Sequence, residues 1–298
     1  MLVSTHIMAR RTTLWAEVAV LGVALIWGAS YPVAKGALTH MPVLLLIFWR
    51  FALAALVMTT VAFRDLRAAG RADLLAGVLL GGILCAIFLA ETWGISMTTA
   101  TNAALIISLC TIFTPFLEFG LRRRLPPAGV MAGATVAVSG VMVLSGGMGA
   151  LGAGDLLILG AAGLRAVMVV STKRLMEGSR LSSAALTAVQ AATVAGLTMA
   201  LLLVQSGPAG LLVSADIGGW ASVAFLSLFC TVGAFYVQNA AVRRTSPTRV
   251  GFLMGTEPLF GFALAWAILS EPATPAALIG AGLIVAGTSL GLAVDRQS

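Results

Sequence analysis

The chain alternates ten apolar segments with short polar connections, and its basic residues gather in every second connection. Each segment has about the 17–25 residues that a helix needs to cross the hydrocarbon of a bilayer. No water-soluble fold needs ten such segments, so the pattern predicts an all-α polytopic membrane protein with ten transmembrane helices. The segments lie near residues 14–36, 43–63, 74–96, 101–121, 127–145, 153–172, 182–205, 219–242, 249–270 and 275–294.

The basic residues predict the orientation of these segments. Of the 18 Lys and Arg residues, 15 lie at the N-terminus, in alternate connections or at the C-terminus. Lys35 ends the first segment on the opposite side, and Arg50 and Arg165 lie within segments. Because basic connections stay on the cytoplasmic side of a membrane, both termini are predicted to be cytoplasmic. The 15 residues are Arg10, Arg11, Arg64, Arg67, Arg71, Arg122, Arg123, Arg124, Lys173, Arg174, Arg180, Arg243, Arg244, Arg249 and Arg296.

The composition limits the partners that we expect. With 59% hydrophobic and 10% charged residues, the chain has too little polar surface to be covered by water, so lipid is its solvent. The net charge of +7 is divided among short connections rather than gathered in one patch, which argues against nucleic acid. Cys85, Cys110 and Cys230 fall inside segments without metal-ligand spacing, so we expect neither a metal nor a cofactor.

The sequence contains an internal repeat. A shift of 147 positions superimposes residues 98–140 on 245–287 without a gap and with eight identities, and a shift of 138 places Lys35 on Lys173. Residues 1–146 and 147–298 are therefore predicted to be two five-helix repeats. Since five crossings are an odd number, the second repeat enters the membrane from the opposite side. Inverted repeats are typical of transporters with a site between the halves, and a single chain is sufficient to form one.

Three stretches resemble a known family: LIWGASYPVAK, FWRFALAAL and PTRVGFLMGTEPLFGFALAWAILSEPATPAALIGAGLIVAG. The chain resembles the EamA-type ten-helix branch of the drug/metabolite transporter superfamily, and most specifically in Glu257-Pro258 and Glu271-Pro272. The N-terminal copy departs from that pattern, with Thr111 opposite Pro258 and Arg124 opposite Glu271. The resemblance implies export of small metabolites across the bacterial inner membrane, and the most similar members export amino acids.

Charged residues inside the segments are the first candidates for a substrate site, because a charge inside a bilayer is costly. Arg50 and Arg165 would suit a substrate carboxylate, since a guanidinium offers a planar fork of donors. Alternatively, each forms a buried ion pair with Glu91 or Glu257. These two glutamates are also the candidates for proton coupling, although Glu257 could instead accept hydrogen bonds at a bend made by Pro258.

Two prolines are predicted to bend their helices. Pro115 and Pro258 lie in equivalent segments but four positions apart in the aligned register, which predicts bends at unequal depths. The small-residue pairs Gly77…Gly81, Gly129…Gly133, Gly251…Gly255 and Gly287…Gly291 predict close packing of helices within the bundle.

Aromatic and neutral polar residues within the segments complete the predicted substrate site. They would give an amphipathic solute apolar walls and a few hydrogen bonds. For Trp93, near a segment end, an interfacial position is the alternative. At other segment ends, Glu17 and Asp155 are expected to be solvated or to cap helices, and Glu118 to pair with Arg122. The aromatic and neutral candidates are Trp27, Ser30, Tyr31, Trp93, Asn102, Gln190, Tyr236 and Asn239.

These features favour a carrier that exports amino acids or related small amphipathic metabolites by alternating access. A carrier for another substrate class, a passive channel and a structural membrane subunit are the alternatives. An enzyme is disfavoured, because the sequence contains no HExxH motif and no nucleophile with a paired base, and both His6 and His40 lie outside the segments.

The predicted orientation can be tested with reporter fusions. Since the connections that contain Gly149 and Gly210 have no basic residues, a phosphatase fused at either position is expected to be active outside the cytoplasm. Activity of a cytoplasm-only reporter at these positions would show that the orientation or the number of crossings is wrong.

Overall fold

In a computed structural model of the chain, the described residues are 2–147, 151–211, 216–269 and 274–295. Side chains are described from residue 14 onward, except those of residues 100, 101, 265 and 267–269. The Glu271-Pro272 pair and Arg296 therefore lie outside the described residues. Within the described ranges the chain is helical and contains no strand.

The helices follow the predicted segments closely. They are α1 (Leu2–Gly28), α2 (Ser30–Ala37), α3 (Val43–Val61), α4 (Phe63–Ala68), α5 (Arg71–Met97), α6 (Ala100–Ile107), α7 (Cys110–Gly120), α8 (Ala128–Leu144), α9 (Ala153–Leu175), α10 (Ser183–Ser206), the 3₁₀ turn η1 (Pro208–Leu211), α11 (Ile217–Ser227), the π-helix η2 (Leu228–Gly233), α12 (Ala234–Val242), α13 (Pro247–Met254), α14 (Glu257–Leu269) and α15 (Pro275–Asp295).

Eight helical stretches among the described residues are long and apolar enough to cross a membrane. Three of them join neighbouring elements: α1 with α2, α6 with α7, and α11 through η2 to α12. Helix α8 is apolar but shorter, with 17 residues. The segment predicted at 249–270 is two helices, α13 and α14. The chain is thus an all-helical, multi-pass membrane protein.

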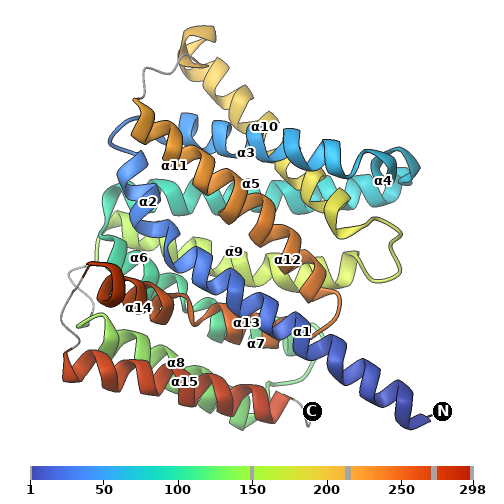
Figure 1. Cartoon of the computed structure of the whole chain (residues 1–298), viewed down its shortest axis with the longest axis vertical. Helices are drawn as coiled ribbons and strands as arrows, with labels where there is room; N and C mark the ends of the chain where they lie inside the picture. The colour runs from blue at the N-terminus through green and yellow to red at the C-terminus, as the bar shows by residue number, and fades with distance from the viewer. Residues whose placement is uncertain (1, 148–150, 212–215, 270–273, 296–298) are drawn as a thin grey trace.

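The helices lie side by side, and their ends define two faces of the molecule. Figure 1 shows both chain termini at one end of the bundle, together with α4 and the connection between α9 and α10. Arg64 and Arg67 belong to α4, and Arg180 belongs to that connection. We call this end the basic end. The connection between α2 and α3 lies at the other end.

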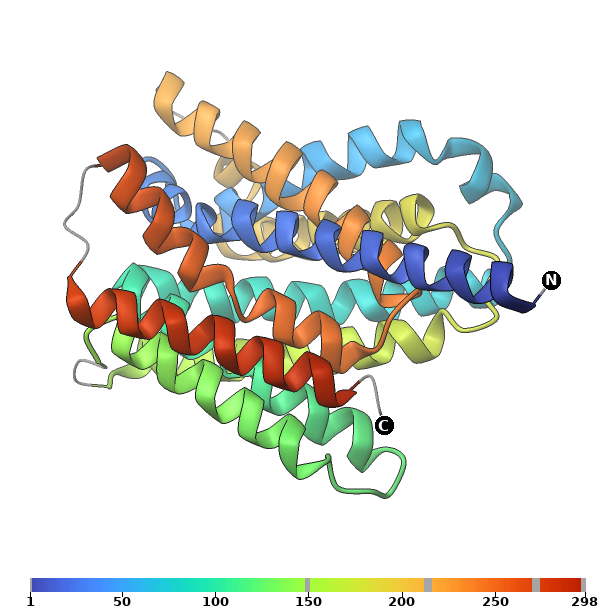
Figure 2. The same ribbon diagram turned by 60° about the horizontal axis from the view of Figure 1, so that its bottom comes forward.

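Among the described helices, α8 and α15 share the most extensive contact, and they are side by side in both views (Figures 1 and 2). A Cβ atom added to Gly133 would lie 2.8 Å from the Gly287 carbonyl oxygen, and one on Gly140 would lie 2.8 Å from that of Gly280. As the residue number rises on α8 it falls on α15, so the helices are antiparallel. Only glycine allows backbones to approach this closely.

This contact is also reciprocal. A Cβ atom on Gly280 would lie 2.7 Å from the Gly140 oxygen, and one on Gly287 would lie 2.6 Å from the Gly133 oxygen. The shift of 147 exchanges Gly133 with Gly280 and Gly140 with Gly287. The two helices therefore present the same face to each other, as across a two-fold axis.

Two helix interruptions occur at equivalent positions. Helix α6 ends at Ile107 and α7 begins at Cys110, and 147 positions later α13 ends at Met254 and α14 begins at Glu257. Both turns are tightened by i→i−3 bonds. The Leu109 N–H donates to the Ile106 oxygen at 3.1 Å, and the Thr256 N–H donates to the Leu253 oxygen at 3.3 Å.

The two prolines lie at different places relative to these interruptions. Pro115 lies inside α7, six positions after the interruption between Ile107 and Cys110. Pro258 is the second residue of α14, directly after the interruption, where its missing N–H removes no intrahelical hydrogen bond. The predicted bends at unequal depths stay a prediction. Gly251 and Gly255 lie against Thr114 and Thr111 of α7, so the C-terminal interruption packs against the equivalent helix.

The α8–α15 contact predicts opposite effects for two glycine substitutions. Gly140→Ala places a Cβ atom 2.6 Å from the Ile284 nitrogen, so the helices must separate, at a cost of about 1–3 kcal/mol. Gly282→Ala, on α15, meets nothing within 4 Å and should preserve or raise stability, since alanine favours helix. Thermal unfolding in detergent measures both. Equal melting temperatures for the two variants would contradict this role of Gly140.

Candidate functional site

One guanidinium and two carboxylates meet inside the bundle. Arg165 Nη2 lies 3.1 Å from Glu91 Oε2, and Arg165 Nη1 lies 3.1 Å from Glu257 Oε1. The Tyr31 hydroxyl approaches Glu257 Oε2 at 3.5 Å. The side chains of Arg165, Glu91 and Glu257 are only 11%, 9% and 3% exposed. We call these three residues the charge cluster.

Close packing of helices brings these side chains together. Glu91 is one turn before Gly94 on α5, and a Cβ atom on Gly94 would lie 2.9 Å from the Gly154 oxygen of α9. Glu257 is the first residue of α14, so the interruption after α13 places its carboxylate at a helix N-terminus, which favours negative charge. Gly28 allows α1 to approach there, because a Cβ atom on it would lie 2.7 Å from the Glu257 carbonyl oxygen.

The cluster has one more carboxylate than guanidinium. An arginine remains protonated in proteins, so the cluster has a net charge of −1 when both glutamates are ionised. Although Glu91 Oε2 lies near Arg165, it receives no well-aligned hydrogen bond. The cluster therefore has both the charge and a vacant acceptor for one additional cation or proton.

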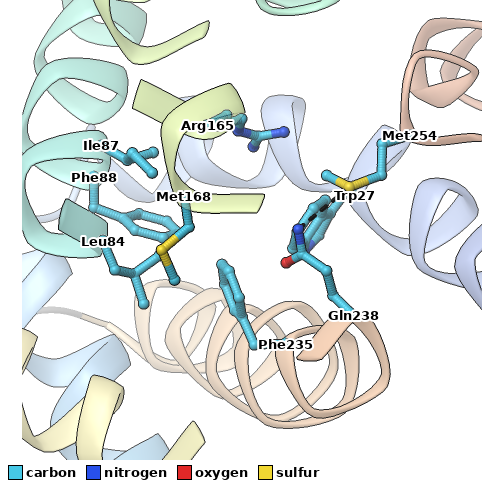
Figure 3. A pocket seen from close by; sticks show the side chains of 9 residues that line it. All are labelled: Trp27, Leu84, Ile87, Phe88, Arg165, Met168, Phe235, Gln238 and Met254. Atoms are coloured by element: carbon cyan, nitrogen blue, oxygen red, sulfur yellow. Dashed lines mark hydrogen bonds between the residues drawn. The ribbon is translucent and has the colours of Figure 1, made fainter. Parts of the chain in front are cut away.

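An aromatic pocket adjoins the charge cluster. Figure 3 shows Arg165 at its edge and the side chains of α1, α5, α9, α12 and α13 around it. The Arg165 Cζ atom lies 5.0 Å from the centre of the Trp27 ring, a cation–π contact. Gln238 donates to the Met254 sulfur at 3.3 Å. The lining residues are Trp27, Leu84, Ile87, Phe88, Arg165, Met168, Phe235, Gln238 and Met254.

Equivalent positions of the repeat face each other in this pocket. The shift of 147 relates Phe88 to Phe235, whose ring centroids are 5.9 Å apart. The shift of 138 relates Trp27 to Arg165, which are in contact. The pocket thus lies where the two halves meet. The pocket leaves free space of about 10 Å³, which is room for about one water molecule.

The predicted polar candidates divide into those near this pocket and those elsewhere. Trp27 lines the pocket, and its indole N–H donates to the Cys230 oxygen at 2.8 Å. Arg165, Glu91 and Glu257 form the ion pairs that we gave as the alternative to substrate binding. Arg50 does not pair with either glutamate; its Nε donates to the Thr231 hydroxyl at 2.8 Å.

Trp93 and Tyr236 do not line the pocket. They are 38% and 44% exposed. Trp93 is two positions after Glu91, and Tyr236 is two positions before Gln238. A separation of two residues is about 200° around a helix, so the inward position of Glu91 and Gln238 directs Trp93 and Tyr236 outward. Trp93 thus takes the outward position expected of the interfacial alternative.

The neutral candidates are hydrogen-bonded elsewhere. The Ser30 hydroxyl donates to the Trp27 oxygen of the preceding turn, at 2.8 Å. Asn239 donates to Gln190 at 2.8 Å, which joins α12 to α10. Asn102 lies 3.4 Å from Asp155, away from the pocket. These polar groups therefore hydrogen-bond to neighbouring helices or turns. Ser30, Asn102, Gln190 and Asn239 do not line the pocket.

Sequence reasoning missed the apolar lining. Phe88, Phe235, Met168 and Met254 resemble ordinary core residues in an apolar sequence. The repeat register was the available signal, since it relates Phe88 to Phe235 and, three residues on, Glu91 to Gln238. Among the described residues, no group of three His, Cys, Asp or Glu could hold a metal ion.

A cluster of polar side chains joins helices at the basic end. Arg249 of α13 donates from Nε to Glu17 of α1 at 2.8 Å, and its Nη1 lies 3.8 Å from Asp295 of α15. Glu118 of α7 accepts hydrogen bonds from the Thr248 N–H and hydroxyl at 2.8 and 2.7 Å. Glu17 is buried, so it joins helices rather than facing solvent as expected. Glu118 is also buried, and it pairs with Arg122 as predicted, with 3.4 Å between Oε1 and Nη2.

A second cluster, at positions related by the repeat, joins helices at the opposite end. Asp155 of α9 accepts from the Thr98 hydroxyl at 2.6 Å and lies near Asn102, and Lys35 donates to the Ile95 oxygen at 2.9 Å. The shift of 138 relates Asp155 to Glu17, and the shift of 147 relates Asn102 to Arg249. An ion pair at one end thus corresponds to a carboxylate–amide contact at the other.

A profile of the EamA-like transporter family matches residues 14–146 and again residues 152–292 of this chain. The chain belongs to this family. An uncharacterized transporter of Archaeoglobus fulgidus is 27% identical over 91% of this chain and 84% of its own length. A probable amino-acid metabolite efflux pump of Salmonella typhimurium is 29% identical over 89% of this chain and 90% of its own length.

A solved crystal structure shares the fold of this family member. It superimposes with a TM-score of 0.77 over 95% of this chain and 98% of its own, at 20% sequence identity. The predicted family is therefore confirmed, and the protein is a multi-pass membrane protein of a transporter family.

The charge cluster predicts a specific pattern of stability. Arg165→Met leaves two buried carboxylates without their partner and should cost about 3–5 kcal/mol of unfolding free energy. The triple variant Glu91→Gln, Arg165→Met, Glu257→Gln removes every charge and should recover most of that loss. Thermal unfolding in detergent at neutral pH compares the two. A triple variant less stable than Arg165→Met would show that charge compensation is not the role of this cluster.

Proposed function

We propose that the protein is a secondary transporter that exports amino acids or related small amphipathic metabolites across the bacterial inner membrane by alternating access. The observation that supports this most directly is the charge cluster beside an aromatic pocket where equivalent positions of the repeat meet. Excess charge in a buried cluster is costly in a membrane, and a bound ligand or coupling ion of opposite charge would reduce that cost.

We further propose ten membrane crossings, arranged as two inverted five-helix repeats over residues 1–146 and 147–298, with both termini in the cytoplasm. Three observations support this arrangement. The same family profile matches two successive segments. The helix interruptions coincide after a shift of 147. The equivalent helices α8 and α15 pack antiparallel through reciprocal contacts, as an axis in the membrane plane requires.

The charge cluster suits one end of an amino acid. Its net charge of −1 favours an ammonium group, and Glu91 Oε2 is a buried acceptor without an aligned donor. The adjoining apolar lining suits a side chain. The name of the Salmonella relative, a probable amino-acid metabolite efflux pump, supports the same substrate class.

The same excess charge provides proton coupling. A proton on Glu91 or Glu257 neutralises the cluster and removes its attraction for an ammonium group. Proton and substrate therefore compete for one site, which is the condition for antiport. Entry of a proton from outside would release the substrate there and drive export.

The polar clusters at the two ends supply the barriers of alternating access. Opening the basic end requires separation of Arg249 from Glu17, and opening the other end requires separation of Asp155 from Thr98 and Asn102. Both clusters are formed in this structure, and the pocket holds about one water molecule.

Reconstitution into proteoliposomes tests the proposed function. A panel of radiolabelled amino acids, offered with and without a pH gradient, should include members with saturable flux that unlabelled substrate inhibits. Flux that is linear in concentration would identify a channel, and saturable flux of other metabolites alone would identify another substrate class. No flux of any solute would favour a structural subunit.

Proton coupling predicts the effect of two substitutions. Glu257→Gln or Glu91→Gln leaves Arg165 with one carboxylate and no excess charge. Each variant is expected to weaken apparent substrate affinity about tenfold, the usual effect of losing one charge-assisted hydrogen bond, and to abolish acceleration by a pH gradient. Asp65→Asn, on the exposed α4, is the matched control. A variant flux that keeps the wild-type response to the gradient would exclude these two carboxylates as the coupling groups.

A further inference from the structure

Arg50 is a buried guanidinium that forms no ion pair with a carboxylate of the described residues. It lies in the middle of α3 and is 8% exposed. Its one hydrogen bond within this part of the chain is from Nε to the Thr231 hydroxyl, at 2.8 Å. Its four Nη N–H groups donate to no described residue.

The contact with Thr231 orients Arg50 without cancelling its charge. Thr231 belongs to the π-helix η2, and its hydroxyl donates to the Leu226 oxygen at 2.9 Å. The Thr231 hydroxyl proton is thus used in the bond to Leu226, and a lone pair of the same oxygen accepts the hydrogen bond from Arg50 Nε. A π-helix in a long helix is costly and is frequently found at functional sites.

Arg50 is connected to the pocket through aromatic rings. Its Cζ atom lies 4.5 Å from the centre of the Phe88 ring. Phe88 contacts Phe235 at 5.9 Å, Phe235 contacts Trp27 at 5.1 Å, and the Trp27 ring lies below Arg165. Three rings in contact thus have a guanidinium at each end, and these rings line the pocket.

The two ends differ in charge. The Arg165 end has a net charge of −1, because two carboxylates surround it. The Arg50 end has a net charge of +1. Isolated burial of a charge costs several kcal/mol, and aromatic faces compensate only part of this. A ligand with an ammonium group and a carboxylate would neutralise both ends at once.

We infer that Arg50 binds the carboxylate of the transported solute, with Thr231 as its positioning residue, while the charge cluster takes the ammonium group. This inference rests on the proposed function and assigns the carboxylate to Arg50 rather than to Arg165. Arg165 is already engaged by two carboxylates, whereas the Nη groups of Arg50 offer the planar fork that a carboxylate matches.

The test compares amino acids with their amides. An amide keeps the ammonium group and the side chain but lacks the negative charge. For the amino acid that wild-type proteoliposomes transport best, inhibition of flux by the unlabelled acid and by its amide gives two apparent affinities. Wild type should prefer the acid. Arg50→Gln should weaken the affinity for the acid about tenfold or more and leave that for the amide unchanged.

Conservative variants separate binding from folding. Arg50→Lys keeps the charge without the fork and should retain part of the preference. Thr231→Ser keeps the hydroxyl and should behave as wild type, whereas Thr231→Val should reduce the preference for the acid. Arg64→Gln, on the exposed α4, is the matched control for loss of one positive charge. If Arg50→Gln does not fold, the Thr231 pair provides the test.

The outcomes distinguish the inference from the function on which it rests. Equal weakening for acid and amide, or an unchanged preference in Arg50→Gln and Thr231→Val, would overturn the role of Arg50 while leaving amino-acid transport intact. A wild type that transports no amino acid would overturn the proposed function and this inference with it.

Discussion

A guanidinium inside a membrane protein keeps its charge, so its burial is costly unless opposite charge lies around it. For Arg165 this requirement brings together Glu91 of α5, Glu257 of α14 and the Tyr31 hydroxyl of α2. These elements can meet because glycines allow close approach and because the chain interrupts itself just before Glu257. The pocket adjoins this cluster, and the two end clusters lie on either side of it along the bundle.

The two halves share a framework but differ in charge at the positions that matter most. Equivalent helices interrupt at the same depth and pack through the same glycines. Yet Arg165 corresponds to Trp27, Glu91 to Gln238, and Arg249 to Asn102. Each of these differences places a charge on one side and a neutral group on the other. The charges are thus distributed unequally between equivalent positions of the two halves.

The sequence predicted the segments, the repeat register and the family, because lipid imposes length and apolarity on every spanning helix. It also singled out the residues of the charge cluster and gave ion pairs as one alternative, but it did not predict that Arg165 binds both glutamates and Arg50 neither. Glu91, Arg165 and Glu257 are far apart in the chain, and spacing alone left two partners open. Trp93 and Tyr236 were assigned to the site by residue type, although their helical phase turns them away from it. The sequence did not predict that both interruptions lie at equivalent positions, because no residue type marks the turn between Ile107 and Cys110.

The contact between α8 and α15 has a mechanical consequence. At its centre, main-chain atoms of one helix touch main-chain atoms of the other, with no long side chain between them. Small rotations at most helix interfaces are absorbed by changes of side-chain rotamer. Here no rotamer is available, so neither helix can tilt or slide without breaking the contact. We therefore expect the two helices to move as one unit, so that in the proposed cycle the motions that expose the pocket are made by the other helices.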